Sequence, residues 1–340
     1  MTEIPLSGRI YQAVPGFEKH LEIELGIGRD TAFACSAADS GLEDPLLPSG
    51  RWGPLYYVNT VPETPVFWQH NTWIRPFLLE FNAISEAARY LRAIQRNWAP
   101  VLHTQFRRGA LIDSLMPPIS RRPRKFPWLL PDSPLGAWTL LDDHRLVGSA
   151  GCSSPFPAGT IRFEEDTDGP PSRAYLKLWE SLVRCRCWPG PGQCCLDAGA
   201  SPGGWTWALA RLGARVIAVD RAEPEPRILA MTGPDGLPAV RYIKHDAFTL
   251  DPAEFGQVDW IFCDVACYPP RLYEWVEKLF AAGIRTNFVC TLKMQGVPDQ
   301  DTARRFAEIP GSQVLHLCHN KHELTWIKLG CVNNNRITQE

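Results

Sequence analysis

The sequence lacks any apolar run long enough to cross a bilayer, and its first residues, MTEIPLSGRI, lack the charged-then-apolar pattern of a secretory signal. It also lacks an excess of charge, because 35 Lys and Arg residues stand against 37 Asp and Glu residues. This balance neither favours nor excludes nucleic acid as a partner, since only the clustering of basic residues bears on that question. We therefore expect a cytoplasmic globular protein with no membrane partner.

Metal-binding pairs of cysteines are absent as well. The 11 cysteines include no C-x-x-C pair, and their odd number does not suit a disulfide framework. Several of them lie in apolar strand patterns, where a thiol behaves as a small hydrophobic side chain. The sequence therefore predicts buried free thiols and no metal site.

The length of the chain suits two domains, or one large domain with an attachment. Of the 340 residues 45% are apolar, which is enough for a sizeable core, and no internal repeat is visible. The best linker is an acidic stretch with Gly and Pro at 164–171. We place the boundary there, between an amino-terminal region at 1–165 and a second domain at 170–340.

The amino-terminal region alternates between strand and helix patterns, which predicts one or two small α+β units rather than a second large parallel sheet. Its expected elements are strands at Gly8–Val14 and Tyr56–Val61, a helix opening at Pro15–Lys19, a loop or insertion at 36–54, a helix over Ile84–Trp98, and a hairpin over Leu140–Gly151 that turns at Asp142–His144.

The most basic stretch of the chain also lies before the predicted boundary, and aromatic residues are interleaved with it. The phosphates and bases of a nucleic acid would meet such a surface favourably, although a solvated Pro-rich loop is the plain alternative. The candidate RNA-binding residues are Arg107, Arg108, Arg121, Arg122, Arg124 and Lys125.

The second domain begins with a helix and continues with alternating strands and helices. Ser172 is expected to cap the first helix, and Lys177 to face off its buried stripe. Two final strands, at Gln313–Cys318 and Leu324–Leu329, are close enough in sequence to pair as a hairpin. The pattern predicts a doubly wound α/β sheet whose last strands need not be parallel.

Polar or charged residues follow all five of the preceding predicted strands. In a doubly wound sheet, ligands bind outside the carboxyl ends of the strands. One aspartate after a strand is commonly a turn residue, but five charged residues in register point to a site. These residues are Asp197, Asp220, Asp246, Asp264 and Lys293.

The stretch Leu196–Trp207 starts as a strand, breaks into a Gly/Pro turn and resumes as a helix. Its glycine spacing, Gly199-x-x-x-Gly203-Gly204, differs from the G-x-G-x-x-G of dinucleotide sites. Asp197 would repel a pyrophosphate and instead suits an amino group, such as the methionine end of S-adenosylmethionine. The loop therefore favours this cofactor over a nicotinamide. The candidate cofactor-binding residues are Ser172, Asp197, Gly199, Ala200, Ser201, Pro202, Gly203, Gly204, Trp205, Asp220, Asp246 and Asp264.

The segment Asp197–Thr206 resembles the D-L-G-A-x-P-G-G-W-[ST] signature of FtsJ-like ribose 2′-O-methyltransferases. The resemblance implies a Rossmann-like class I methyltransferase sheet, S-adenosylmethionine as cofactor, and an active site made of Lys177, Asp264, Lys293 and Glu323. Further segments that resemble motifs of this family are Ser172–Leu178, Asp264–Ala266, Leu292–Gln295 and His322-Glu323.

Two earlier segments, Val14–Lys19 and Ser153–Gly159, resemble the ribosomal RNA large subunit methyltransferase M family. That resemblance implies an RNA-binding region at 1–165 with a THUMP-like, ferredoxin-like part. It also implies 2′-O-methylation of a ribose, that of a cytidine, in 23S ribosomal RNA, naked or in an early precursor.

In this interpretation Lys293 orients or deprotonates the 2′-hydroxyl, and Lys177 is the neighbouring cation that would lower its pKa. Asp264 and Glu323 would hold the two lysines. The alternatives are an RNA-binding protein with a catalytically inactive domain, or a methyltransferase acting on another RNA or on a small molecule.

Overall fold

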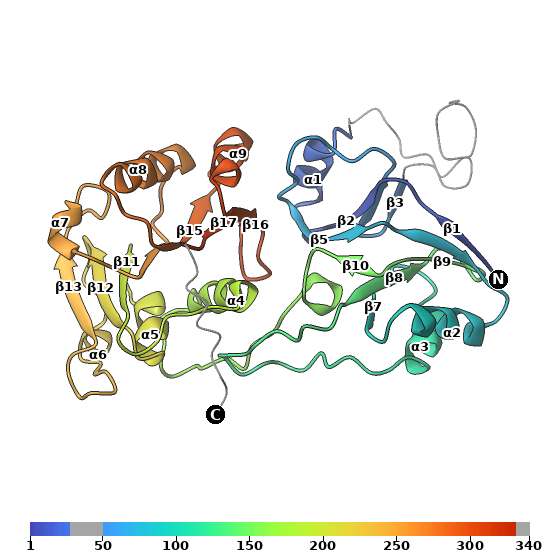
Figure 1. Cartoon of the computed structure of the whole chain (residues 1–340), viewed down its shortest axis with the longest axis horizontal. Helices are drawn as coiled ribbons and strands as arrows, with labels where there is room; N and C mark the ends of the chain where they lie inside the picture. Colours follow the sequence, from blue (N-terminus) through green and yellow to red (C-terminus); the bar gives the residue numbers. More distant parts are fainter. Residues whose placement is uncertain (28–49, 331–340) are drawn as a thin grey trace. The chain divides into compact units, whose positions relative to one another are not determined.

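The computed structural model describes residues 1–27 and 50–330 and divides the chain into two compact units (Figure 1). Unit 1 comprises Met1–Arg124 and Leu130–Arg162, and unit 2 comprises Lys125–Leu129 and Phe163–Glu340. Among the described helices, none has the length and apolar character that a bilayer crossing requires.

Over its described residues, unit 1 contains two five-stranded sheets and three α-helices. The helices are α1 (Glu18–Glu24), α2 (Ile84–Ile94) and α3 (Phe106–Ser114). The first sheet has the order β1 (Thr2–Pro5), β6 (Phe77–Glu80), β9 (Arg145–Ser149), β8 (Gly136–Leu140) and β7 (Trp98–Pro100). The second has the order β10 (Gly151–Cys152), β5 (Gln69–Ile74), β2 (Arg9–Ala13), β4 (Leu55–Val58) and β3 (Gly50–Trp52).

The predicted first strand, first helix and hairpin of unit 1 are confirmed as β2, α1 and the β8–β9 pair. The helix predicted over Ile84–Trp98 is too long, because Gln95 is extended and Trp98 pairs with Gly136 in the first sheet. The loop predicted at 36–54 is wrong at Gly50–Trp52, which forms β3, and most of its remainder lies outside the described residues. The THUMP-like character of this region stays a prediction.

Unit 2 is built on one seven-stranded sheet. Its order is β13 (Val240–Lys244), β12 (Arg215–Asp220), β11 (Cys194–Ala198), β14 (Trp260–Cys263), β15 (Asn287–Lys293), β17 (Glu323–Lys328) and β16 (Ser312–Leu315). The first five strands are parallel, whereas β17 is antiparallel to both of its neighbours. The predicted doubly wound sheet with a terminal antiparallel hairpin is confirmed.

Helices cover both faces of this sheet. On one face lie α4 (Tyr175–Cys185) and α5 (Gly204–Arg211), and on the other lie α8 (Pro269–Ala281) and α9 (Gln300–Glu308) (Figure 1). The connections through α6 (Pro226–Leu229) and α7 (Pro252–Phe255) hold only four helical residues each. The strand order reverses at β11, between β12 and β14, and a crevice at such a point is where ligands bind.

Helix α4 begins later than predicted, and Lys177 on it is more buried than predicted. It begins at Tyr175, and the Ser172 hydroxyl only accepts a 3.4 Å hydrogen bond from the Ala174 amide, so Ser172 is not its cap. All residues from Tyr175 to Val183 are buried, and Lys177 is among them. Aromatic rings account for part of this burial, since Phe126 stacks on Trp179 with ring centroids 4.8 Å apart.

The nine cysteines within the described residues are all free thiols. The predicted burial holds for four of them and is wrong for the other five, which are half-buried: Cys152, Cys185, Cys187, Cys194 and Cys318. Cys263 and Cys290 lie opposite each other on β14 and β15, and both are buried. Across the described residues, no group of three or more His, Cys, Asp or Glu side chains is placed to hold a metal ion.

Candidate active site

Four charged side chains converge at one edge of the unit 2 sheet. Lys177 comes from α4, Asp264 directly follows β14, and Lys293 is the last residue of β15. Glu323 is the first residue of β17 and lies opposite Lys293 in register. Because β17 is antiparallel, its beginning lies beside the end of β15. We call Lys177, Asp264, Lys293 and Glu323 the tetrad.

Within the tetrad each lysine contacts both carboxylates. The Lys177 Nζ lies 3.0 Å from Asp264 Oδ1 and 2.8 Å from Glu323 Oε1. The Lys293 Nζ lies 2.5 Å from Asp264 Oδ1 and 2.7 Å from Glu323 Oε2. Two ammonium groups thus balance two carboxylates, which is the condition for burying this many charges at tolerable cost.

The two lysines of the tetrad differ in their access to solvent. The Lys177 side chain is 8% exposed, whereas the Lys293 side chain is 22% exposed. Lys293 is therefore the more accessible of the two lysines.

The pKa shifts of Asp264 and Lys293 favour the ionised state of these two side chains. Burial would raise the pKa of Asp264, but the charges of Lys177 and Lys293 outweigh it and bring the pKa below its ordinary value. Burial would likewise lower the pKa of Lys293, but Asp264 and Glu323 raise it above the ordinary lysine value. The lowered Lys293 pKa expected from the sequence is therefore wrong, because two carboxylates act on this lysine at closer range than a second cation.

A buried glutamate on α4, Glu180, supports the tetrad and was missed by the sequence analysis. Its Oε1 accepts hydrogen bonds from the Cys318 amide at 3.0 Å and from Arg184 Nε at 3.1 Å. Its Oε2 accepts from the His319 amide at 3.2 Å and lies 2.8 Å from the His319 Nδ1. Burial opposes ionisation, but His319 and Arg184 lower the pKa of Glu180 to about 2.

These bonds fix the loop that leads into β17. Asn320 follows in the same loop, and its Nδ2 donates to the Glu323 carbonyl at 3.0 Å. Glu180 is also only three residues after Lys177 on one helix, so α4 positions two members of the tetrad at once. A sequence signal existed, because a glutamate inside an apolar helix must find partners when it is buried.

Asp197 on β11 is a fully buried carboxylate with an unsatisfied oxygen. Its Oδ2 accepts from the Thr206 hydroxyl at 2.6 Å, and its Oδ1 has no partner among the described residues. Burial, with the charges of Asp264 and Asp220, raises the pKa of Asp197 to about 7. An unpaired carboxylate at the point where the strand order reverses fits a cationic group of a ligand.

The glycines of the β11–α5 loop are accounted for by the packing of the chain itself. Gly199 has a φ of 82°, and a Cβ there would lie 2.7 Å from Val265 Cγ2. A Cβ on Gly204 would lie 2.6 Å from the Ser172 Oγ. The sequence analysis assigned these residues to ligand access, whereas the structure gives them close contacts with the loop after Asp264 and with Ser172.

Comparisons with known proteins bear on this domain in particular. Residues 170–331 match the family model described as FtsJ-like methyltransferase. Residues 170–331 belong to the FtsJ-like methyltransferase family. The resemblance noted in the sequence is confirmed for this domain, and we call it the FtsJ-like domain.

Two curated relatives named ribosomal RNA large subunit methyltransferase M are similar to this chain. One, from Laribacter hongkongensis, is 36% identical over 147 residues, which are 42% of this chain and 39% of that protein. One from Xanthomonas oryzae pv. oryzae is 29% identical over 257 residues, which are 71% of this chain and 68% of that protein. A solved ribosomal RNA methyltransferase from Plasmodium falciparum aligns over 47% of this chain and 97% of its own, at 14% identity and a TM-score of 0.35.

Two further residues that were predicted to bind the cofactor, Asp220 and Asp246, already have hydrogen-bond or ion-pair partners within the protein. The Asp220 carboxylate accepts from the backbone amides of Ser201 at 3.0 Å and Ala222 at 2.9 Å. Asp246 forms ion pairs with Arg221 and, at 3.0 Å, with Arg271. Both carboxylates keep lone pairs for a ligand, but Asp246 is engaged more heavily than the sequence suggested.

Trp205, another residue that was predicted to bind the cofactor, lies in the core of the FtsJ-like domain. The indole Nε1 donates to the Ala174 carbonyl at 2.8 Å, and the ring is 6.0 Å from the Lys177 Nζ. Trp205 therefore ties α5 to the start of α4 beneath the tetrad, which is a supporting position.

The predicted RNA-binding residues outside the FtsJ-like domain fall into two groups. Arg107, Arg121 and Arg122 are exposed, whereas Arg108 is half-buried with its guanidinium 5.6 Å from the Phe81 ring centre. Arg124 is half-buried and Lys125 is exposed, the latter in unit 2. The sequence analysis did not name three exposed arginines in this region: Arg89 and Arg92 on α2, and Arg96 just beyond its end.

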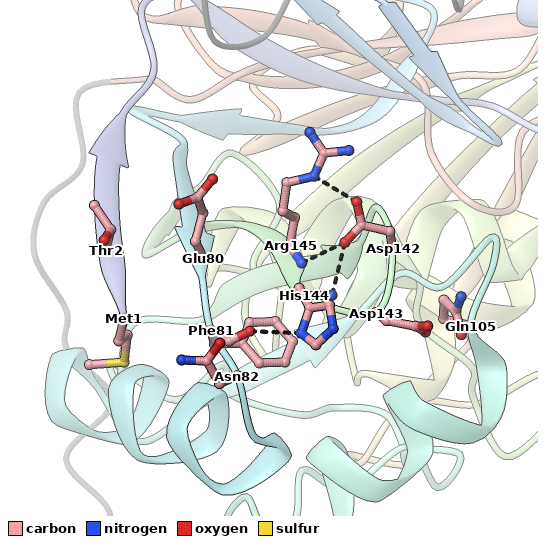
Figure 2. Close-up of a pocket in the computed structure, with 10 residues that line it drawn as sticks. All are labelled: Met1, Thr2, Glu80, Phe81, Asn82, Gln105, Asp142, Asp143, His144 and Arg145. Carbon is pink, nitrogen blue, oxygen red and sulfur yellow. Dashed lines mark hydrogen bonds and ion pairs between the residues drawn. The ribbon is translucent and has the colours of Figure 1, made fainter.

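A cleft of about 660 Å³ in unit 1 contains none of the predicted site residues (Figure 2). Its lining includes Glu80, Asp142 and Asp143, and Asp142 pairs with Arg145 at 2.6 Å. The predominance of carboxylates disfavours RNA phosphates there. None of the exposed arginines Arg89, Arg92 and Arg107 lines this cleft.

Proposed function

We propose that the protein transfers a methyl group from S-adenosylmethionine to a ribose 2′-hydroxyl of large-subunit ribosomal RNA. The observation that carries this proposal is the tetrad, in which two ammonium groups and two carboxylates meet at the ligand-binding edge of an FtsJ-like domain. The printed names of the relatives support ribosomal RNA as the substrate class. We further propose that the target is a cytidine in 23S ribosomal RNA.

The residues of the β11 edge fit S-adenosylmethionine. The unpartnered Asp197 Oδ1 would accept from the ammonium of its methionine end, and Asp220 from its ribose hydroxyls. When bound, this cofactor supplies a sulfonium methyl group. The backbone from Gly199 to Gly204, followed by the amino terminus of α5, would surround its central part.

Lys293 would hold the attacking hydroxyl. Its raised pKa keeps it an ammonium, so it acts as a hydrogen-bond donor that orients O2′ and stabilises negative charge on it. Lys177, which is more deeply buried, would hold the two carboxylates in place.

Glu323 Oε2 is the proton acceptor that the hydrogen-bond pattern favours. Asp264 Oδ1 accepts from Lys177, Lys293 and Thr291, and Asp264 Oδ2 accepts from Lys177. Among the described residues Glu323 Oε2 accepts only from Lys293, the lysine that would hold the hydroxyl. As the O2′–methyl bond forms and the bond from the methyl group to the sulfonium sulfur breaks, leaving a thioether, the hydroxyl would become strongly acidic and its proton would pass to this oxygen.

The decisive experiment supplies the purified protein with S-adenosylmethionine carrying a labelled methyl group and with transcripts of large-subunit or small-subunit ribosomal RNA. We expect label only in the large-subunit RNA, at one alkali-resistant 2′-O-methyl cytidine. Label at a base, or in both RNAs equally, would contradict the proposal. The absence of label despite measured cofactor binding would favour an inactive RNA-binding protein.

The exposed arginines offer a separate test of RNA as the partner. A triple variant in which Gln replaces Arg107, Arg121 and Arg122 should bind RNA more weakly. The slope of log affinity against log salt concentration should fall in magnitude by about two to three. A small-molecule methyltransferase would keep its activity in this variant.

A further inference from the structure

The loops that follow Asp264 and Lys293 each present a large apolar side chain to solvent. Over its described residues, unit 2 exposes four such side chains by more than a third. Two of them stand four residues after a member of the tetrad: Tyr268 after Asp264, with 61% exposure, and Val297 after Lys293, with 88% exposure. Strands β14 and β15 are parallel neighbours, so both loops leave the same edge of the sheet.

The backbone of Tyr268 is held on both sides while its ring stays exposed. Before it, Cys267 is buried and its amide donates to the Val265 carbonyl at 3.0 Å. After it, α8 begins at the buried Pro269, and the Arg271 amide donates to the Tyr268 carbonyl at 3.1 Å. Among the described residues, the ring and the hydroxyl of Tyr268 have no partner.

This loop lies within electrostatic reach of the reacting lysine. Burial raises the pKa of the Cys267 thiol to about 12, and the charge of Lys293 is among those that act in the opposite direction on it. Tyr268 is therefore an aromatic residue whose backbone is held near the tetrad and whose ring is open to solvent.

An RNA substrate accounts for such a ring. To bring a 2′-hydroxyl to Lys293, a nucleotide must leave its helix, and its unstacked base must find a new surface. Aromatic side chains supply that surface to bases of any identity. We propose that Tyr268 stacks on a base of the substrate RNA next to the reacting ribose, with Val297 as an apolar wall beside it. This rests on the proposed function.

The kinetic test replaces Tyr268 with Ala, Leu and Phe, and uses Leu237→Ala as a matched control. Leu237 is 55% exposed in the same unit and lies away from the strand ends that carry the tetrad. For a large-subunit RNA transcript, Tyr268→Ala should raise KM by about 5- to 150-fold, with kcat and cofactor affinity little changed. Tyr268→Phe and Leu237→Ala should stay within about twofold of the wild type.

Two kinetic outcomes would overturn the proposal. One is a KM within twofold of wild type in Tyr268→Ala. The other is equal KM values for the Leu and Phe variants, which would assign the effect to apolar bulk rather than stacking.

A binding measurement separates this proposal from the proposed function. A single-stranded RNA oligonucleotide carrying 2-aminopurine should lose fluorescence on binding the wild type and the Phe variant, but not the Ala variant. If the wild type quenches the probe yet methylates no RNA, the proposed function fails and the stacking role stands. If the wild type does not quench it, or the Ala variant quenches it equally, the stacking role fails.

Discussion

Asp197 lies on β11, Asp264 directly follows the neighbouring parallel strand β14, and their pKa values move in opposite directions. Asp197 is buried and Asp264 is half-buried. Asp264 faces two lysines, which lower its pKa despite the cost of burial. Asp197 has a hydroxyl and an unfilled oxygen, and its pKa rises to about 7. Burial raises the pKa of both carboxyls, so the opposite direction of the two shifts comes from the lysine partners of Asp264.

The contrast separates two uses of a carboxylate. The charge of Asp264 is already balanced within the protein, by Lys177 and Lys293. Asp197 lacks a cation, and because its pKa is raised in the folded state, its ionisation destabilises the fold as pH rises through about 7. A cationic ligand would remove that cost, so binding strength is obtained at the expense of stability in the free protein.

The largest effect is expected from removing one of the two lysines that pair with Asp264. Lys293→Ala should lower kcat by about 10²- to 10⁴-fold, because the group that orients and polarises the hydroxyl is lost. The affinity for S-adenosylmethionine, measured by calorimetry, should change little. Arg211→Ala, at the end of α5, is the matched control for removing a cation from the same unit. Full activity in Lys293→Ala would remove it from the mechanism.

Neutralising Asp197 should lower the affinity for the cofactor and leave the rate of methyl transfer at saturating cofactor little changed. Asp197→Asn should weaken S-adenosylmethionine binding by about 10²-fold, because the ammonium loses its buried counter-charge. The same variant should unfold at a higher temperature than the wild type at pH 8, since up to about 4 kcal/mol of charge burial is relieved. An unchanged melting temperature at pH 8 would mean that Asp197 is not strained in the free protein.

The pH dependence of cofactor binding sharpens the comparison without a mutation. Below pH 7 Asp197 takes up a proton in the free protein, so the Kd for S-adenosylmethionine should rise by about tenfold per pH unit. Calorimetry between pH 5.5 and 8 in buffers matched for ionic strength measures this slope. The Asn variant should show a flat profile over the same range.

A smaller effect is expected from changing Glu180, which holds the loop that leads to Glu323. Glu180→Gln keeps the shape of the side chain but weakens its hold on the loop before Glu323, so kcat should fall by about fivefold. The cofactor Kd should stay constant, which distinguishes displacement of Glu323 from general unfolding. Arg184→Gln, which leaves the bonds from Glu180 to Cys318 and His319 in place, should be milder; a larger loss in Arg184→Gln would contradict this order.

Much of unit 2 follows from its sequence, because its strands are short apolar runs that end in a charged residue. Asp197, Asp264 and Lys293 lie at or directly beyond strand ends, as predicted, and the tetrad is assembled. Unit 1 was less predictable, since its sheets depend on distant pairings such as β1 with β6, which periodicity does not reveal. The pKa of Lys293 was out of reach for a similar reason: its direction depends on distances to residues 29 and 30 positions away.

The insertion of β17 between β15 and β16 has a consequence for the order of events during synthesis. β16 is made before β17 but lies outside it, so the ribosome must release Glu323 before the sheet can close. Before β17 joins the sheet, Lys177 and Lys293 would have Asp264 as their one partner within the tetrad, which leaves one positive charge in excess among these three side chains. A chain that stopped short of Glu323 would keep three members of the tetrad and lack the carboxylate that completes its charge balance.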